Sequence, residues 1–308
     1  MITTVTLNAA VDVTYVVDRI QHGGSHRIAS VRRRAGGKGI NVARVLAALG
    51  HSTTVTGLVG GTAGEAVRRD LAGAGLADAL VPITGETRHT VTVVEEEADD
   101  ASVFLEAGPP VTAGEWAEFK AVYGRLLRRS RAVVLSGSLP PGLPEDTYAE
   151  LVTLARQQNV PAVVDTTGNA LLASLDASPA VVKPNRSELC ETLGTEDAQA
   201  GAHRLRRAGA EAVVVSLGAD GMLALTPDGE LIAEPPRRMT GNPTGAGDAA
   251  VAALSAGLAL GTSWPERLRE AVALSAAAVS APLAGDFDDP TYRELLAQAR
   301  AVPLASAP

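Results

Sequence analysis

A glycine-rich turn at residues 242–248, with the sequence NPTGAGD, leads directly into a run of small apolar residues typical of a helix. Unpaired backbone N–H groups at a helix start bind anions, and the helix dipole adds positive potential there. Asp248 falls in the first turn of this helix, where its carboxylate would lie beside both a phosphate and an attacking hydroxyl. The pattern therefore indicates phosphoryl transfer to an alcohol. A purely structural interpretation is also open, in which Gly245 and Gly247 only permit a tight turn.

In the chemical interpretation, Asp248 orients and deprotonates the hydroxyl as a general base. The backbone N–H groups at the turn, from Gly245 through Ala246 and Gly247 to Asp248, then steady the charge on the transferred phosphoryl group. Neither contribution suffices alone, so the turn and the carboxylate form one predicted catalytic unit.

A second glycine-rich segment, residues 35–43 with the sequence AGGKGINVA, opens another predicted helix that ends at Gly50. The glycines, Gly37 among them, allow the backbone to approach a ligand closely, and Asn41 offers both a donor and an acceptor to a hydroxyl. The segment is typical of a polyol site, although a plain turn before a helix fits it too. It is not a phosphate-binding loop of the Walker A type, because that pattern is absent from the chain.

Composition excludes several classes of function. The chain has 308 residues and a net charge of −8, which argues against a nucleic-acid or anionic membrane partner, and its 3% aromatic content argues against stacking on bases. Anionic substrates then require a local basic pocket. Hydrophobic residues make up 46%, enough for a sizeable core.

Neither a dedicated transition-metal site nor an internal disulfide is expected. Cys190 is the single cysteine of the sequence, so no internal disulfide can form. The histidines lack paired metal-ligand spacing; they are His22, His26, His51, His89 and His203. No stretch of 18 uninterrupted apolar residues and no basic leader is present, and we expect a cytoplasmic protein.

Short apolar runs alternate with helical stretches along most of the chain, which predicts a parallel sheet covered on both faces. The expected strands are residues 2–7, 53–58, 132–136, 162–165, 180–183 and 211–216. A capping-box pattern at 62–65 predicts a helix to about Ala72, and residues 264–280 and 290–301 read as closing helices. Ligands are expected beyond the carboxyl ends of the strands.

Two β-hairpins interrupt this alternation. Residues 13–20 with 26–33, and residues 88–97 with 102–106, carry β-branched and polar residues in near alternation, as in a sheet with one covered face. The two hairpins are predicted to form one small separate sheet. We expect a single α/β domain over 1–308, with a lid made by two discontinuous segments, about 12–34 and 87–107.

Taken in order, seven segments of the chain resemble the sugar kinases of the ribokinase-like (PfkB) family, and most closely its phosphosugar branch of the tagatose-6-phosphate kinase and 1-phosphofructokinase type. They are residues 4–12, 35–43, 85–88, 136–142, 183–188, 216–221 and 242–248. The resemblance covers nearly the whole chain. It implies a ribokinase-like, doubly wound, mostly parallel sheet with helices on both faces and a small β-sheet lid over the sugar site.

The resemblance also implies a nucleotide site for ATP. Magnesium is expected on chemical grounds to bridge the nucleotide phosphates. Asn185 and Glu188 would hold its waters, although an Asn followed three residues later by Glu is equally a capping-box arrangement. The hairpin interpretation of residues 216–221 can coexist with nucleotide binding. The nucleotide-site residues that the resemblance implies are Lys183, Asn185, Ser216, Gly218, Gly221, Thr244 and Gly247.

On the acceptor side, Asp12, Gly37 and Asn41 would bind sugar hydroxyls. The usual proline of the first motif is replaced by Ala9, which loosens the turn but retains Asp12. Guanidinium groups suit phosphate oxygens, so basic residues near the lid favour a phosphorylated sugar, with solvated lid charges as the alternative. The residues expected at that phosphate are Arg27, Lys38, Arg88 and Ser138.

The sequence as a whole predicts an ATP-dependent, magnesium-dependent kinase of tagatose 6-phosphate, fructose 1-phosphate or fructose 6-phosphate that forms a bisphosphate. A free-sugar or nucleoside kinase of the same fold is the first alternative, and a non-catalytic sugar-phosphate sensor is another. The exposed edges of a small lid also predict a homodimer through the lid. Dependence on a monovalent cation stays open.

Overall fold

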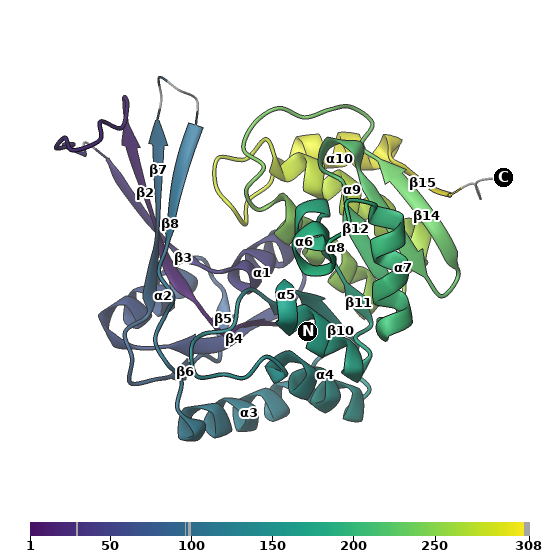
Figure 1. The fold of residues 1–308 in the computed structure, drawn as a ribbon, viewed down its shortest axis with the longest axis horizontal. Coiled ribbons are helices and arrows are strands. Elements are labelled where there is room, and N and C mark those ends of the chain that lie inside the picture. Colours follow the sequence, from purple (N-terminus) through teal and green to yellow (C-terminus); the bar gives the residue numbers. More distant parts are fainter. Residues whose placement is uncertain (29, 96, 98–99, 305–308) are drawn as a thin grey trace.

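A long, mostly parallel β-sheet forms the body of the protein (Figure 1). The computed structural model describes residues 1–28, 30–95, 97 and 100–304. Within these residues the sheet has 11 strands, in the order β15-β14-β13-β12-β11-β10-β9-β1-β4-β5, with β6 paired to β4. The strands are β1 (Ile2–Thr6), β4 (Thr53–Val59), β5 (Ala77–Asp78), β6 (Val81–Pro82), β9 (Ala132–Ser136), β10 (Ala162–Asp165), β11 (Val181–Val182), β12 (Val213–Ser216), β13 (Met222–Thr226), β14 (Gly229–Glu234) and β15 (Arg300–Pro303).

Helices cover both faces of the sheet. Neighbouring strands of this sheet pair in parallel in the spatial order β4, β1, β9, β10, β11, β12. At one end of the sheet, β13, β14 and β15 pair antiparallel. The helices are α1 (Lys38–Ala48), α2 (Gly61–Gly73), α3 (Ala113–Leu127), α4 (Thr147–Gln157), α5 (Gly168–Ser174), α6 (Arg186–Leu193), α7 (Ala198–Ala208), α8 (Ala246–Leu260), α9 (Trp264–Ala278) and α10 (Asp289–Gln298).

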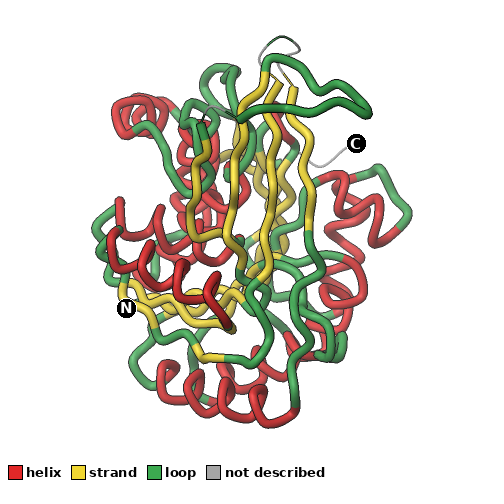
Figure 2. Tube along the Cα trace, turned by 90° about the vertical axis from the view of Figure 1, so that its left-hand side faces the viewer, coloured by secondary structure: helices red, strands yellow, loops and turns green. Residues whose placement is uncertain are grey.

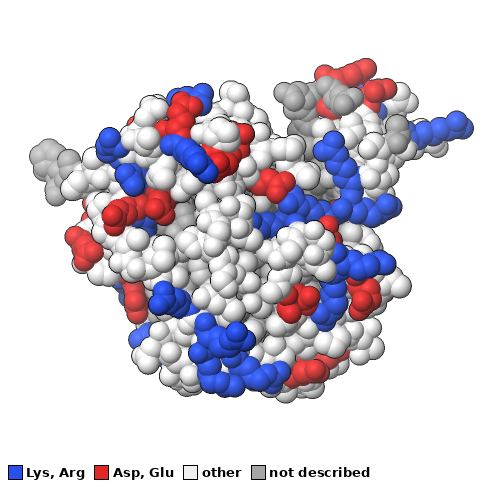
Figure 3. Space-filling view, turned by 180° about the vertical axis from the view of Figure 1, so that it is seen from behind, with Lys and Arg blue, Asp and Glu red and all other residues white. Residues whose placement is uncertain are grey.

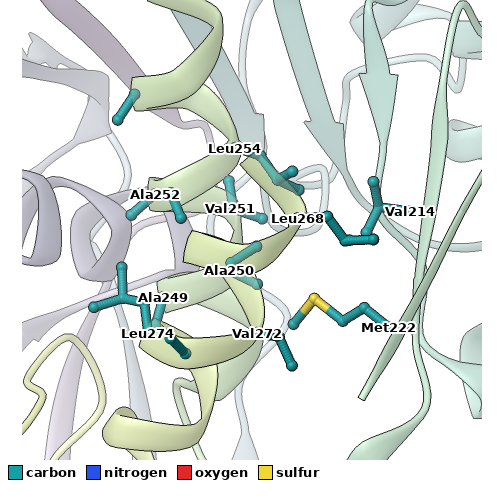
Figure 4. Close-up of a cluster of buried hydrophobic side chains, with 14 of the residues drawn as sticks. Val214, Met222, Ala249, Ala250, Val251, Ala252, Leu254, Leu268, Val272 and Leu274 are labelled. Carbon is teal, nitrogen blue, oxygen red and sulfur yellow. The ribbon is translucent and has the colours of Figure 1, made fainter. Parts of the chain in front are cut away.

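Two hydrophobic cores lie on opposite faces of the sheet, and alternation along the strands explains them. On β9, Val134 belongs to the core under α8 and α9, while Val133 and Leu135 belong to the core under α3 and α4. Because both faces of such a strand are buried, its residues form a continuous apolar run. Figure 4 shows the first core, where small residues of α8 allow α9 to pack closely.

The lid is a separate four-stranded sheet that projects from one end of the body (Figures 1 and 2). Its order is β3-β2-β7-β8, and its strands are β2 (Ala10–Val17), β3 (Val31–Gly36), β7 (Arg88–Glu95) and β8 (Asp100–Leu105). The two predicted hairpins do form one sheet, joined by the parallel pairing of β2 with β7. The strands of the first hairpin are displaced from the predicted ranges 13–20 and 26–33, because β2 spans Ala10–Val17 and β3 spans Val31–Gly36.

Three further local predictions were wrong. Thr62 does not cap α2; Gly60 is the N-cap, without a side-chain hydrogen bond, and Thr62 bonds Glu86 instead. The last helix ends at Gln298, and residues 300–303 form β15 against β14. The run at 180–183 contributes only the two-residue strand β11.

Among the described residues, no helix combines the length and apolar character needed to cross a membrane. Despite the net charge of −8, Lys and Arg side chains gather where the lid joins the body (Figure 3). The surface is therefore locally basic beside the lid.

Leu254 on α8 tests the first core, since it is fully buried beside Leu268 and Val251 (Figure 4). Leu254→Ala should lower the free energy of unfolding by about 2–5 kcal/mol through lost burial and a cavity. Urea unfolding followed by circular dichroism measures this. The control Leu260→Ala changes a residue of the same helix that is 61% exposed, and an equal loss in both variants would contradict the assignment of Leu254 to the core.

Candidate active site

A cavity of about 1080 Å³ lies beyond the carboxyl ends of the strands, facing the lid. Thr6, Asp165 and Ser216 end β1, β10 and β12 and line it, and Arg88, Thr90 and Leu105 line it from the lid. Strand ends of a parallel sheet expose polar groups at one edge, and here two helix starts open onto the same edge. The cavity therefore joins elements that are distant in sequence.

The turn before α8 has the geometry of an anion site. Gly245 is the N-cap at φ 91°, a backbone conformation that favours glycine, and no side chain caps the helix there. A Cβ on Gly245 would lie 2.8 Å from the Cα of Ala284, so the close approach of a neighbouring loop also requires glycine. The Ala246 N–H donates to the Pro243 carbonyl at 3.1 Å, so among the described residues the N–H groups of Gly247 and Asp248 remain for a bound anion at this helix start.

Asp248 stands in the first turn of α8 and is buried. Its Oδ2 accepts a hydrogen bond from Asn41 Nδ2 of α1 at 2.8 Å. Burial, together with the nearby charge of Asp165, raises the pKa of Asp248 to about 7, against smaller opposing effects of Lys38, Asn41 and Lys183. A carboxyl group with a pKa near neutrality is suited to accept a proton from a hydroxyl.

Asp165 is the centre of a buried charge cluster. Its two carboxylate oxygens lie 3.3 Å from Lys38 Nζ and 3.3 Å from Lys183 Nζ, and Ser136 Oγ donates to it at 2.9 Å. Burial would raise the pKa of Asp165, but Lys183, Lys38 and the Ser136 hydrogen bond lower it to about 2. The charge of Asp165 in turn raises the pKa of Lys38. Asp165 therefore stays ionised and holds both ammonium groups at the cavity wall.

Asn185 and Glu188 form the capping box of α6. Asn185 Oδ1 accepts from the Glu188 N–H at 2.8 Å, and Glu188 Oε2 accepts from the Asn185 N–H at 2.9 Å. Glu188 Oε1 lies 3.4 Å from Lys38 Nζ. The capping interpretation is confirmed, and both residues also line the cavity.

The remaining residues that we predicted to bind the nucleotide also line the cavity. Ser216, Gly218 and Gly221 line the cavity around a single 3₁₀ turn between β12 and β13. Lys183 and Thr244 line it as well. The hairpin interpretation of this segment is also correct, since β13 pairs antiparallel with β14 and β12.

Arg88 and Ser138 lie at the lid end of the cavity, linked through Asn8. Arg88 Nε donates to the Asn8 carbonyl at 3.1 Å and its Nη1 to the Glu106 carbonyl at 3.2 Å, while Asn8 Nδ2 donates to Ser138 Oγ at 3.2 Å. These bonds fix the guanidinium beside the serine. The pair offers N–H and O–H donors suited to a phosphate.

Two predicted site residues do not line the cavity. Asp12 is on lid strand β2, where burial raises its pKa to about 6 against the opposing charge of Arg88 and a hydrogen bond from Thr90. Arg27 lies exposed in the connection between β2 and β3, so its placement on a strand facing the sugar site was wrong. The reason is the late start of β3, which begins at Val31 and not at residue 26 as predicted.

All other predicted site residues line the same cavity. They are Gly37, Lys38, Asn41, Arg88, Ser138, Lys183, Asn185, Glu188, Ser216, Gly218, Gly221, Thr244, Gly245, Ala246, Gly247 and Asp248. Asn8, Thr90 and Asp165 were missed as site residues. A charged residue at the end of the apolar run 162–165 was the available signal for Asp165.

The parallel sheet with its β-lid, and an aspartate at a glycine-primed helix start, define a ribokinase-like kinase fold. The family model for pfkB family carbohydrate kinases matches residues 4–291, and the chain belongs to this family.

Two similar proteins with known names are phosphofructokinases, in agreement with this family. The chain is 42% identical over 267 residues to a 1-phosphofructokinase of Xanthomonas campestris pv. campestris, which covers 83% of each protein. Phosphofructokinase-2 of Escherichia coli, solved in complex with potassium, superposes with a TM-score of 0.89 at 30% identity, over 96% of this chain and 98% of that one. Arabidopsis thaliana ribokinase complexed with ribose and ATP, at 21% identity, a TM-score of 0.75 and coverage of 96% and 98%, shows the fold alone.

The Asn41 bond gives a prediction about the ionisation of Asp248. Removing a hydrogen bond to the charged form disfavours that form, so Asn41→Ala should move the pKa of Asp248 above about 7. NMR titration of the aspartate carboxyl carbons measures the shift. The control Asn169→Ala removes an exposed amide from α5, and an unchanged or lowered pKa in Asn41→Ala would refute the assigned bond.

Proposed function

We propose that this protein transfers the γ-phosphoryl group of ATP to a free hydroxyl of fructose 1-phosphate and releases ADP and fructose 1,6-bisphosphate. Membership of a carbohydrate kinase family and the 1-phosphofructokinase relative support the reaction class. The observation that supports the proposal most strongly is that Asp248 lines the same cavity as Arg88 and Ser138. Asp248 is bonded to Asn41 and lies in the first turn of α8, which no side chain caps. One cavity thus holds a base, an anion site and a second set of phosphate donors.

In the proposed reaction, Asp248 accepts the proton of the attacking hydroxyl. Such a base supplies roughly 10²–10⁴-fold. The N–H groups of Gly247 and Asp248 stabilise charge on the transferred phosphoryl group, whereas that of Ala246 closes the turn onto the Pro243 carbonyl. Lys38 and Lys183, held by Asp165, contribute positive charge at the cavity wall. The Ser216–Gly221 turn and Thr244 bind the nucleotide.

At the other end of the cavity, Arg88 and Ser138 bind the 1-phosphate of the acceptor. Asn41 and the backbone at Gly37 bind sugar hydroxyls, and the negative charge of Asp12 favours the charged form of Arg88. Arg88 Nε and Nη1 already donate to Asn8, Thr90 and Glu106, and within the described residues its Nη2 makes no hydrogen bond, so Nη2 is the donor left for the phosphate.

The residues of this site fit a magnesium ion whose main ligands would be the phosphate oxygens of the nucleotide. Within the described residues, no group of three or more His, Cys, Asp or Glu could hold a metal. Glu188 and Asn185 are partly committed to each other, so they would hold water molecules of an ion bound mainly by phosphates. Bound there, magnesium would neutralise phosphate charge.

A monovalent cation stays a proposal, supported by the potassium complex of the Escherichia coli relative. Omission of potassium from the assay tests it. The cytoplasm is the proposed location, because the reaction consumes ATP.

The reaction is tested by ATP turnover with five acceptors, each at matched concentration. They are fructose 1-phosphate, fructose 6-phosphate, tagatose 6-phosphate, fructose and tagatose. Fructose 1-phosphate should give the highest kcat/KM. A higher value for another acceptor would refute the assigned substrate, and turnover with none would refute the proposal as a whole.

Asp248→Asn should lower kcat by about 10²-fold or more, because the amide cannot accept the proton. Fold and binding of an ATP analogue should be unchanged, as judged by circular dichroism and calorimetry. Asp228→Asn, in an exposed turn, is the matched control. Near-normal turnover by a folded Asp248→Asn protein would remove Asp248 from the mechanism.

Arg88→Ala should reduce kcat/KM for the phosphorylated acceptor by about 1.5–3 kcal/mol, the range for a charged hydrogen bond. Slow turnover of free fructose should hardly change. Arg32→Ala, an exposed arginine of β3, provides the control. Equal losses on both acceptors would show that Arg88 serves the lid structure and not the phosphate.

The lid also supports a homodimer. Large apolar side chains are exposed on β8, namely Val103 at 55%, Phe104 at 59% and Leu105 at 71%, with Val31 on β3 at 38%. Exposed apolar residues on a sheet with open edges favour association.

Phe104→Glu should therefore shift the protein from dimer to monomer in light scattering at micromolar concentration. The control Leu260→Glu introduces the same charge at an exposed site remote on α8. A wild-type protein that is monomeric with and without substrate would reject the dimer.

A further inference from the structure

Arg34, on lid strand β3, forms a bidentate ion pair with a loop of the body. Its Nη2 lies 2.6 Å from Asp286 Oδ1 and its Nη1 lies 2.8 Å from Asp286 Oδ2. Nη1 also donates to the Ala284 carbonyl at 3.2 Å. Two parallel bonds from one guanidinium fix orientation as well as distance. The loop after α9 is thus attached to the lid.

The same loop supports the anion-binding turn from behind. Gly245 approaches Ala284 so closely that a Cβ on Gly245 would lie 2.8 Å from the Ala284 Cα and 3.2 Å from the Gly285 nitrogen. Asn242 donates from Nδ2 to the Pro282 carbonyl at 3.4 Å. Displacement of residues 282–286 would therefore displace the turn that begins α8.

The loop also touches the partner of the base. Gly285, at φ 83°, lies against α1, where an added Cβ would come within 3.1 Å of the Asn41 Cα and 3.1 Å of the Arg44 Cδ. Asn41 in turn bonds Asp248. Lid strand, loop, anion-binding turn and base are therefore one chain of direct contacts.

A second connection anchors the base of β3. Asp70 of α2 accepts from the Ala35 N–H at 2.9 Å and pairs with Arg44 of α1. Ala35 directly follows Arg34 in β3. The strand is therefore bonded to α2 at Ala35 and to the loop after α9 at Arg34. The Arg34–Asp286 pair joins lid strand β3 to the loop that packs against the turn at Gly245.

We propose that the Arg34–Asp286 pair couples the position of the lid to the geometry of the anion-binding turn, so that nucleotide at Gly245 tightens the lid over the acceptor. Arg34 and Asp286 are positioning residues that touch neither substrate. The Arg34 side chain is 22% exposed and that of Asp286 41%. Their bidentate pair joins two separate parts of the fold, the lid and the loop after α9, as a contact that couples two sites must. This inference rests on the proposed function for the nucleotide site alone and is independent of which sugar is bound.

Hydrogen exchange measured by mass spectrometry tests the coupling, with a non-hydrolysable ATP analogue and magnesium as the only ligands. In the wild type, nucleotide should slow exchange of the β2 and β3 amides by at least about fivefold, in the usual range of coupling between sites. Arg34→Met and Asp286→Ala should each abolish this protection. The control Arg33→Met, an exposed arginine of the same strand, should retain it.

Two further readouts separate coupling from folding. The thermal midpoints of Arg34→Met and Asp286→Ala should stay close to that of the wild type, and calorimetry should show that both variants still bind the analogue. Lid protection that persists in both variants, or that is absent from a wild-type protein with normal nucleotide binding, would overturn the coupling while leaving the proposed function intact. A wild-type protein that binds no nucleotide would overturn both.

Discussion

Two carboxylates buried at the same edge of one sheet are the constraint on which the rest of the site depends. Burial disfavours ionisation of both, and each also disfavours ionisation of the other. Lys38 and Lys183 lie against Asp165 and keep it ionised, whereas the hydrogen-bond partner of the Asp248 carboxylate within the described residues is the neutral Asn41. Their pKa values separate to about 2 and about 7. One carboxylate is a fixed anchor, and the other is the base that we propose for this phosphosugar kinase.

The fold makes this arrangement possible by delivering each group on a different element. Asp165 ends β10, Lys183 follows β11, Lys38 and Asn41 begin α1, and Asp248 begins α8. The two helices pack together under the first core, so that their starts open onto one cavity. The lid completes the cavity, which Arg88, Thr90 and Leu105 of β7 and β8 line.

Sequence patterns predicted what local chemistry determines. The runs 132–136 and 162–165 are strands with the predicted bounds, because each is an uninterrupted apolar run buried on both faces. The two glycine turns and Asp248 were found because their residue types have few other uses together. Tertiary choices were not predictable: Thr62 bonds Glu86 across the fold instead of capping α2, and residues 300–303 pair with β14 because that edge strand needs a partner. Asp165 was missed because its role arises from two lysines that only the folded sheet brings near.

The pH dependence of kcat/KM for fructose 1-phosphate tests the central claim most directly, since it reports ionisation of the free enzyme's base. A base with a pKa of about 7 predicts that kcat/KM falls about tenfold for each pH unit below that value and levels off above it. The limb should move to higher pH in Asn41→Ala, which an ionisation of the substrate phosphate would not do. A profile that is flat from about pH 5 to 8, or a limb unmoved by Asn41→Ala, would contradict the assignment of Asp248 as the base.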